Sequence, residues 1–195
     1  MKNNSIKITV ALFICCYQFG YSQYKYEREY RILKSQFPAK AISAIEKNIN
    51  DYKRIKFYKE TDSIKISYEA KLKKDKLWYS IEFDKEGGLE DIEILIKTID
   101  IPNDTYANIE TYLNNNFRKY RIKKIQQQYP SNSSPLEEVF KNAFQNLILP
   151  SNHYEIEVVG QKRKGYLDYE ILFDAEGNFK QIRTSLPPNY DHILY

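Results

Sequence analysis

The sequence predicts an α+β fold of two tandem units, in each of which helices pack on one face of an antiparallel sheet. The first observation is a repeated stretch, because residues 83–87 read FDKEG and residues 173–177 read FDAEG. The second is that apolar positions around these stretches match, as Tyr79 does with Tyr169. The third is the helical spacing of apolar residues upstream of each stretch. Matched positions on both sides of a shared motif indicate a duplicated unit.

Residues 36–98 are expected to form the first unit. Pro38 stands where a helix favours proline in its first turn, and Ile42, Ile45 and Ile49 follow at helical spacing. Alternating apolar and polar residues then predict four strands, over residues 54–60, 64–73, 77–84 and 89–97.

Residues 99–186 are expected to form the second unit, which is longer because a helix is inserted in it. Ser134 and Pro135 are typical of a helix start, and Glu137 completes the pattern of a capping box. The inserted helix is therefore predicted over residues 135–147. The other elements of this unit are a helix over residues 103–116 and strands over residues 118–128, 153–160, 165–174 and 178–185.

Three segments lie outside the two units. Residues 23–35 are predicted to form a helical lead-in, and residues 187–195 an irregular tail. Residues 1–22 have the pattern of a secretory signal peptide: two lysines, a short apolar stretch, and the small residues Gly20 and Ser22 before the cut.

Removal of this signal peptide changes the chemistry available to the protein. The segment holds two Lys and no Asp or Glu, so the formal net charge of +4 falls to +2. Both cysteines, Cys15 and Cys16, leave with it, and the mature chain is expected to have neither thiol nor disulfide. The sequence thus predicts an exported protein, periplasmic or secreted, whose mature chain has no membrane span because no apolar run reaches about 18 residues.

The remaining polar residues give no pattern of a catalytic, cofactor or metal site, so none is predicted. His153 and His192 are the only histidines, too few for a triad or a zinc cluster. The acid pairs at residues 84 and 86 and at residues 174 and 176 lie in predicted hairpin turns, where Asp is favoured for backbone reasons. The basic runs at 118–124 and 162–164 are diluted by acids, so no nucleic-acid partner is predicted.

The pattern Tyr-x-Ile-x-Phe-Asp-x-Glu-Gly occurs at residues 79–87 and again at residues 169–177. Together with the preceding helices, it resembles the PepSY-like domain, in two copies over residues 36–185. The chain looks most like the exported PepSY-like proteins of Bacteroidetes-type bacteria, which are grouped with the beta-lactamase inhibitory protein. This resemblance implies a non-catalytic binding or inhibitory module that acts outside the cytoplasm.

An outward-facing patch on the first sheet is the predicted contact surface for an extracytoplasmic protein partner. It consists of Trp78 and Glu82 on one strand, with Lys65 and Lys71 on the neighbouring strand. Tryptophan is favoured at interfaces because it buries a large area with few rotatable bonds.

Two other functions stay open. The chain could carry a small apolar ligand between helix and sheet, near Tyr106 and Phe144. It could also be a hydrolase that uses Asp84 or Asp174.

Overall fold

The computed structural model describes residues 23–25, 27–62, 65–162 and 165–185 of the chain. The predicted signal peptide and the predicted tail lie outside these residues. The strands are β1 (Gln23–Lys25), β2 (Glu27–Ile32), β3 (Lys53–Asp62), β4 (Lys65–Lys74), β5 (Leu77–Asp84), β6 (Leu89–Leu95), β7 (Lys119–Pro130), β8 (His153–Gln161), β9 (Tyr166–Asp174) and β10 (Phe179–Ser185). The helices are α1 (Ala39–Asn48), α2 (Asn103–Asn116) and α3 (Leu136–Phe144), with 3-10 turns η1 (Lys34–Gln36), η2 (Thr98–Asp100) and η3 (Ser131–Ser133).

All ten strands belong to one sheet, in the order β1-β10-β9-β8-β7-β6-β5-β4-β3-β2. The prediction of two tandem helix-plus-sheet units is therefore wrong. Its failure has one physical cause, which is that β6 pairs antiparallel with β7, with Ile92 opposite Tyr129 and Glu93 opposite Gln128. This pairing makes a single sheet out of the strands that had been assigned to separate units.

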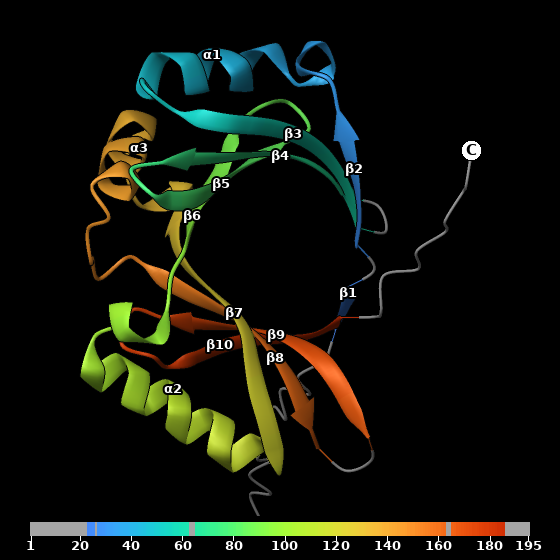
Figure 1. The fold of residues 1–195 in the computed structure, drawn as a ribbon, viewed down its shortest axis with the longest axis vertical. Helices are drawn as coiled ribbons and strands as arrows, with labels where there is room; N and C mark the ends of the chain where they lie inside the picture. The colour runs from blue at the N-terminus through green and yellow to red at the C-terminus, as the bar shows by residue number, and fades with distance from the viewer. Residues whose placement is uncertain (1–22, 26, 63–64, 163–164, 186–195) are drawn as a thin grey trace, which may run out of the picture.

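The sheet curls until its two ends come close, as Figure 1 shows. Strand β1 pairs parallel with β10, whereas β2 pairs antiparallel with β3 at the other end of the sheet. Only residue 26 separates β1 from β2 in the chain. A stretch of ten residues, 23–32, thus contributes a strand to each end of the curled sheet.

The helical lead-in predicted for residues 23–35 is also wrong, since this segment forms β1, β2 and the start of η1. An isolated helix of this length is marginal in water. The sheet ends at β3 and β10 instead offer rows of backbone donors and acceptors, which the segment pairs with.

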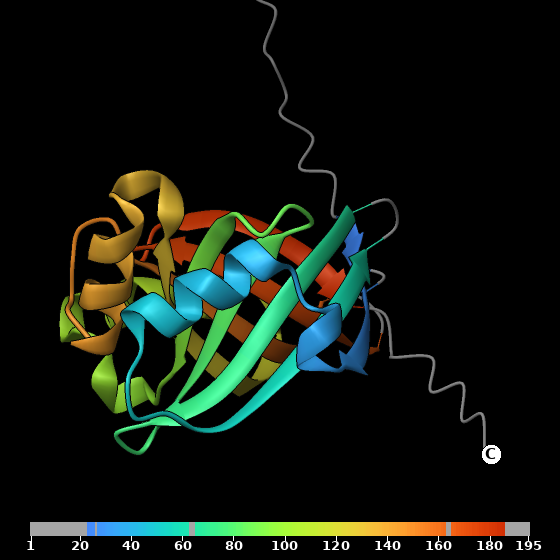
Figure 2. The same ribbon diagram turned by 90° about the horizontal axis from the view of Figure 1, so that it is seen from above.

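The three helices lie on the convex side of the curled sheet, and the hydrophobic core fills the space between (Figure 1). Figure 2 shows the cyan helix α1 lying across the green strands. The helices bury Ala41, Ile45, Ile109, Leu113, Val139, Phe140 and Ala143. The strands meet them with alternate side chains that are also buried, among them Ala70, Leu72, Tyr79, Ile81, Phe83, Ile92, Ile94, Tyr154, Ile156, Ile171 and Phe173.

Helix α3 is shorter than predicted and begins one residue later. Pro135 occupies the position before the first helical residue, and no side chain caps the helix there. The predicted capping box of Ser134 and Glu137 is therefore not formed. The helix ends at Phe144 because Asn146 adopts a positive φ of 49°, which a helix cannot continue through.

None of the described helices combines the length and the hydropathy needed to cross a membrane.

The hairpin between β9 and β10 is held against α2 by two hydrogen bonds. The Thr105 hydroxyl donates to the carbonyl oxygen of Ala175 at 2.9 Å, and the Asn108 amide donates to that of Glu176 at 2.8 Å. Gly177 has a φ of +82°, and a Cβ built on it would come within 2.3 Å of the Thr105 carbonyl oxygen. Glycine is therefore required here for two reasons, its backbone conformation and the close approach of the helix.

Gly165 offers a matched control, because its φ is +70° and a Cβ there would meet no atom of the described residues within 4 Å. We expect Gly165→Ala to lower the free energy of unfolding by about 1 kcal/mol through backbone strain alone. Gly177→Ala should lower it by about 2–4 kcal/mol, because the clash with α2 adds to the strain. Urea denaturation of both variants measures the difference, and equal losses would contradict the close approach.

Candidate functional site: the concave polar face

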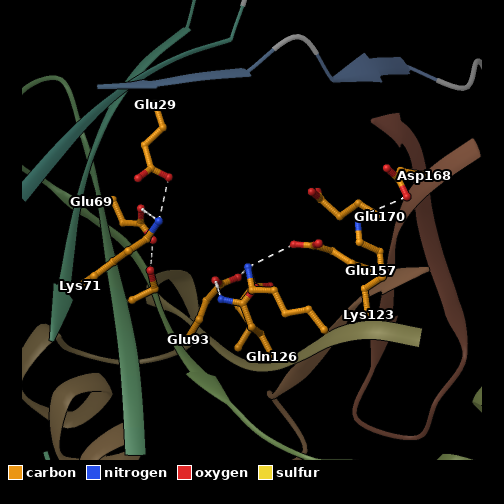
Figure 3. Close-up of polar contacts among 12 residues, drawn as sticks. Glu29, Glu69, Lys71, Glu93, Lys123, Gln126, Glu157, Asp168 and Glu170 are labelled. Atoms are coloured by element: carbon orange, nitrogen blue, oxygen red, sulfur yellow. Dashed lines mark hydrogen bonds and ion pairs between the residues drawn. The ribbon is translucent and has the colours of Figure 1, made fainter. Parts of the chain in front are cut away.

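The concave face of the sheet is polar, although much of it is buried. Figure 3 shows charged and amide side chains pointing into the space that the sheet encloses. Glu69 and Glu93 are only 5% and 4% exposed. The Ser80 hydroxyl donates to Glu69, and the Gln126 amide donates to Glu93. These hydrogen bonds offset the unfavourable free energy of burying polar groups away from water.

Along β4 to β9 these side chains alternate with those of the core, so this part of the sheet separates an apolar layer from a polar one. Glu69 on β4 and Ser80 on β5 lie on this second face and are nevertheless buried. The curl of the sheet is the physical reason, because it turns the second face toward itself instead of toward open solvent.

Acidic residues stand directly opposite one another on neighbouring strands of this face. The opposed pairs are Glu29 with Glu60, Glu69 with Glu82, Glu82 with Asp91, and Glu157 with Glu170. Like charges opposite one another destabilise a sheet by about 0.2–1 kcal/mol per pair. Such an arrangement opposes folding, which marks this face as a candidate functional surface.

A cavity of about 310 Å³ opens on this face. Its walls come from both halves of the curled sheet. The lining residues are Asp62, Lys65, Ser67, Glu82, Glu90, Asp91, Glu93, Gln128, Glu155, Glu170 and Arg183. Seven of these side chains are acidic and two are basic. The cavity is therefore acidic in a chain whose overall formal charge is +4.

Asp91 and Glu93 form the most strongly perturbed part of the cavity. Burial raises the pKa of both carboxyls well above the usual range, and the nearby charges of Glu82 and Glu155 raise it further. The Gln128 amide donates to Asp91 Oδ2 at 3.1 Å and to Glu93 Oε1 at 3.3 Å. The other oxygen of Asp91, Oδ1, is buried and accepts no hydrogen bond from any residue that the structure describes.

Two groups of carboxylates on this face are close enough to hold a metal ion together. The ligand oxygens of Glu82, Asp91 and Glu93 lie within 4.8 Å of one another, and so do those in a second group. The second group comprises Glu29, Glu60 and Glu69.

Lysines compensate part of the acidic charge outside the cavity. Lys71 lies 2.8 Å from both Glu29 and Glu69. Burial alone would lower the pKa of Lys71, but these two carboxylates raise it above its ordinary value. Lys124 lies 3.2 Å from Glu157. Burial would lower the pKa of Lys124, but its acidic neighbours raise it above its ordinary value.

The structure places all four residues of the predicted contact surface on the concave face, on the neighbouring strands β4 and β5. Trp78 is 40% exposed and has the Lys73 ammonium 5.4 Å from its ring centroid. Glu82 lines the cavity, as does Lys65, which contacts Glu90 at 2.9 Å. Lys71 is held in its ion pairs, so the use of these residues in binding stays a prediction.

Sequence reasoning missed the cavity residues that β6 and the second half of the chain contribute. Asp91, Glu93, Gln128, Glu155 and Glu170 come from β6, β7, β8 and β9. The available signal was the alternation of acidic and apolar residues at 89–95 and 153–159. That pattern predicts a polar face but cannot indicate that the face is curled into a cavity.

The aspartates of the two hairpin acid pairs accept hydrogen bonds from backbone N–H groups of their turns, as predicted. Asp84 Oδ1 accepts the N–H groups of Glu86 at 2.9 Å and Gly88 at 2.7 Å. Asp174 Oδ1 likewise accepts those of Glu176 at 3.1 Å and Asn178 at 2.8 Å. Burial alone would raise the pKa of Asp174, but donation from Asn178 lowers it below its ordinary value. Both carboxylates therefore stabilise the turns in which they lie.

His153 begins β8, and its Nδ1 lies 3.3 Å from the Gln128 side-chain oxygen. Burial and Lys180 lower the pKa of His153.

The predicted ligand site near Tyr106 and Phe144 has no observation in its favour, because the Phe144 ring packs against Tyr79 at a centroid distance of 4.5 Å. The carrier hypothesis thus stays a prediction.

The raised pKa of Asp91 gives a pH-dependent prediction. Since the folded state keeps this proton to higher pH than the unfolded chain does, the free energy of unfolding falls as pH rises from about 4 through the raised value. Asp91→Asn removes that contribution. The variant should be more stable than the parent by about 1 kcal/mol at pH 8, with the difference vanishing toward pH 4.

Thermal and urea denaturation across this pH range measure the effect. Glu110→Gln is the matched control, because it makes the same carboxylate-to-amide change at an exposed position on α2. A constant deficit of Asp91→Asn at all pH values would contradict the assignment.

No protein-family model matches the sequence, and no curated protein matches it. Solved structures do share the fold. A DUF2874 family protein from Bacteroides ovatus superposes with a TM-score of 0.52 at 11% identity, covering 75% of this chain and 86% of that one. A BLIP-like protein from Bacteroides fragilis gives a TM-score of 0.50 at 16% identity, with coverages of 82% and 93%.

A Bacteroides eggerthii protein described as periplasmic gives a TM-score of 0.51 at 12% identity, covering 75% of this chain and 88% of that one. At these identities, the likeness establishes the architecture. The fold of this chain is that of the DUF2874 and BLIP-like structures.

Proposed function

We propose that this chain is an exported, non-catalytic binding protein that holds an extracytoplasmic protein against the concave face of its sheet and restrains an enzyme in this way. One observation carries the proposal. The convex face holds the hydrophobic core and the helices, whereas the concave face keeps opposed acidic pairs around a cavity of about 310 Å³. A stability cost concentrated on one face supports a binding role for that face.

The concave face also carries an apolar anchor next to the acidic cavity. In the register of β5 and β6, Tyr79 lies opposite Ile94, so Trp78 and Leu95 are neighbours on the other face. They are 40% and 43% exposed. Exposed aromatic and aliphatic side chains beside a polar surface are typical of interface centres.

Export and the absence of catalysis rest on the sequence and on the similar structures. The first 22 residues have the signal-peptide pattern, and one structure of the same fold is described as periplasmic. The inhibitory role extends the resemblance to PepSY-like proteins, and another structure of this fold is described as BLIP-like. The hydrolase hypothesis loses support because Asp84 and Asp174 both bind backbone N–H groups of their own turns.

Photo-crosslinking tests which face binds. A photoreactive benzoylphenylalanine at position 78 on the concave face should crosslink a defined protein in periplasmic extract of the source bacterium. The same residue at position 99 is the control, because Ile99 is 84% exposed in η2, between β6 and α2.

Mass spectrometry of the product then identifies the partner, and Trp78→Ala should weaken binding of that purified partner about tenfold or more. Crosslinking from position 99 alone, or equal yields from both positions, would contradict the proposal.

A further inference from the structure

We infer that the acidic cavity of the concave face receives a basic side chain, arginine or lysine, that the partner protein presents. This inference rests on the proposed function and names the chemistry by which the same face recognises its partner. Charge complementarity is the first argument. Seven acidic side chains and two basic ones line the cavity, and a cation entering it would stabilise the charged form of Asp91 and Glu93, which burial disfavours.

The two basic side chains of the lining leave Asp91 and Glu93 without a cationic hydrogen-bond partner. Lys65 contacts Glu90 at 2.9 Å, and Arg183 lies 3.9 Å from Glu170. The hydrogen bonds that Asp91 and Glu93 accept come from the neutral amides of Gln126 and Gln128. Within the described part of the chain, Asp91 and Glu93 thus accept their side-chain hydrogen bonds from neutral amides, while Lys65 and Lys124 act on them through charge at longer range.

An orphaned oxygen is the second, independent argument. Asp91 Oδ1 is buried and has no hydrogen-bond partner among the described residues, although Oδ2 of the same carboxylate has one. A buried acceptor left unpaired costs about 1–3 kcal/mol. A donor supplied by an incoming group would remove this cost, and the neighbouring Glu82 and Glu93 oxygens, within 4.8 Å, would accept its other protons.

The size of the cavity favours an organic cation over a bare metal ion. About 310 Å³ accommodates a guanidinium or ammonium group together with its methylene chain. A guanidinium presents five donors in a plane and can bridge two carboxylates, which matches the cluster of Glu82, Asp91 and Glu93.

Calorimetry with a model peptide tests the inference on the full mature chain. The probe is acetyl-Gly-Gly-Arg-Gly-Gly-amide, and its control is the same peptide with neutral citrulline in place of arginine. We expect the arginine peptide to bind about tenfold or more tightly than the citrulline peptide, and its binding to weaken as salt is added.

The double variant Asp91→Asn/Glu93→Gln should weaken binding of the arginine peptide about tenfold or more. Glu110→Gln, an exposed acid on α2, should leave binding within about twofold. Circular dichroism establishes that each variant is folded, and Asp91→Asn alone provides a second, milder test.

Equal binding of the two peptides, or unchanged binding in the double variant, would overturn the inference. So would calcium chloride alone producing heat at this cavity when the arginine peptide produces none, because the site would then be a metal site. Crosslinking from position 78 combined with no arginine preference would leave the proposed function standing and remove only this inference.

Discussion

The pairing of β6 with β7 is the interaction on which the rest of the structure depends. It joins the strands that follow α1 to those that follow α2, and it sets Glu93 beside Gln128. Without it, each half would present an open polar face to solvent. With it, ten strands form one curled sheet whose concave side is enclosed. The candidate site exists only because residues from both halves meet across this junction.

The two faces of the sheet contribute to stability in opposite ways. The convex face buries large apolar side chains such as Phe83, Ile156 and Phe173 against the helices, each of which stabilises the fold by about 1.5–3 kcal/mol. The concave face keeps opposed carboxylates and raises the pKa of Asp91 and Glu93 by burying them. The core stabilises a fold that tolerates an unfavourable polar face, and this imbalance supports the proposal that the concave face binds a partner.

Local signals predicted the elements well. The bounds of β5 and α2 agree with the predicted 77–84 and 103–116, and Asp84 and Asp174 form the turns that Asp and Gly favour. Long-range pairing was not predictable, because nothing in residues 23–32 distinguishes a strand at the ends of a curled sheet from a short helix. The cavity was missed for the same reason, since an alternating pattern shows a polar face but not its curvature.

The most direct test of the account is nuclear magnetic resonance mapping of the side-chain amides while the arginine peptide is added. Gln126 and Gln128 lie on the concave face beside Glu93, whereas Gln145 follows α3 on the other side of the sheet. The account predicts that the amide signals of Gln126 and Gln128 shift together and saturably, while that of Gln145 stays fixed. Shifts at Gln145 with none at Gln126 and Gln128 would contradict it.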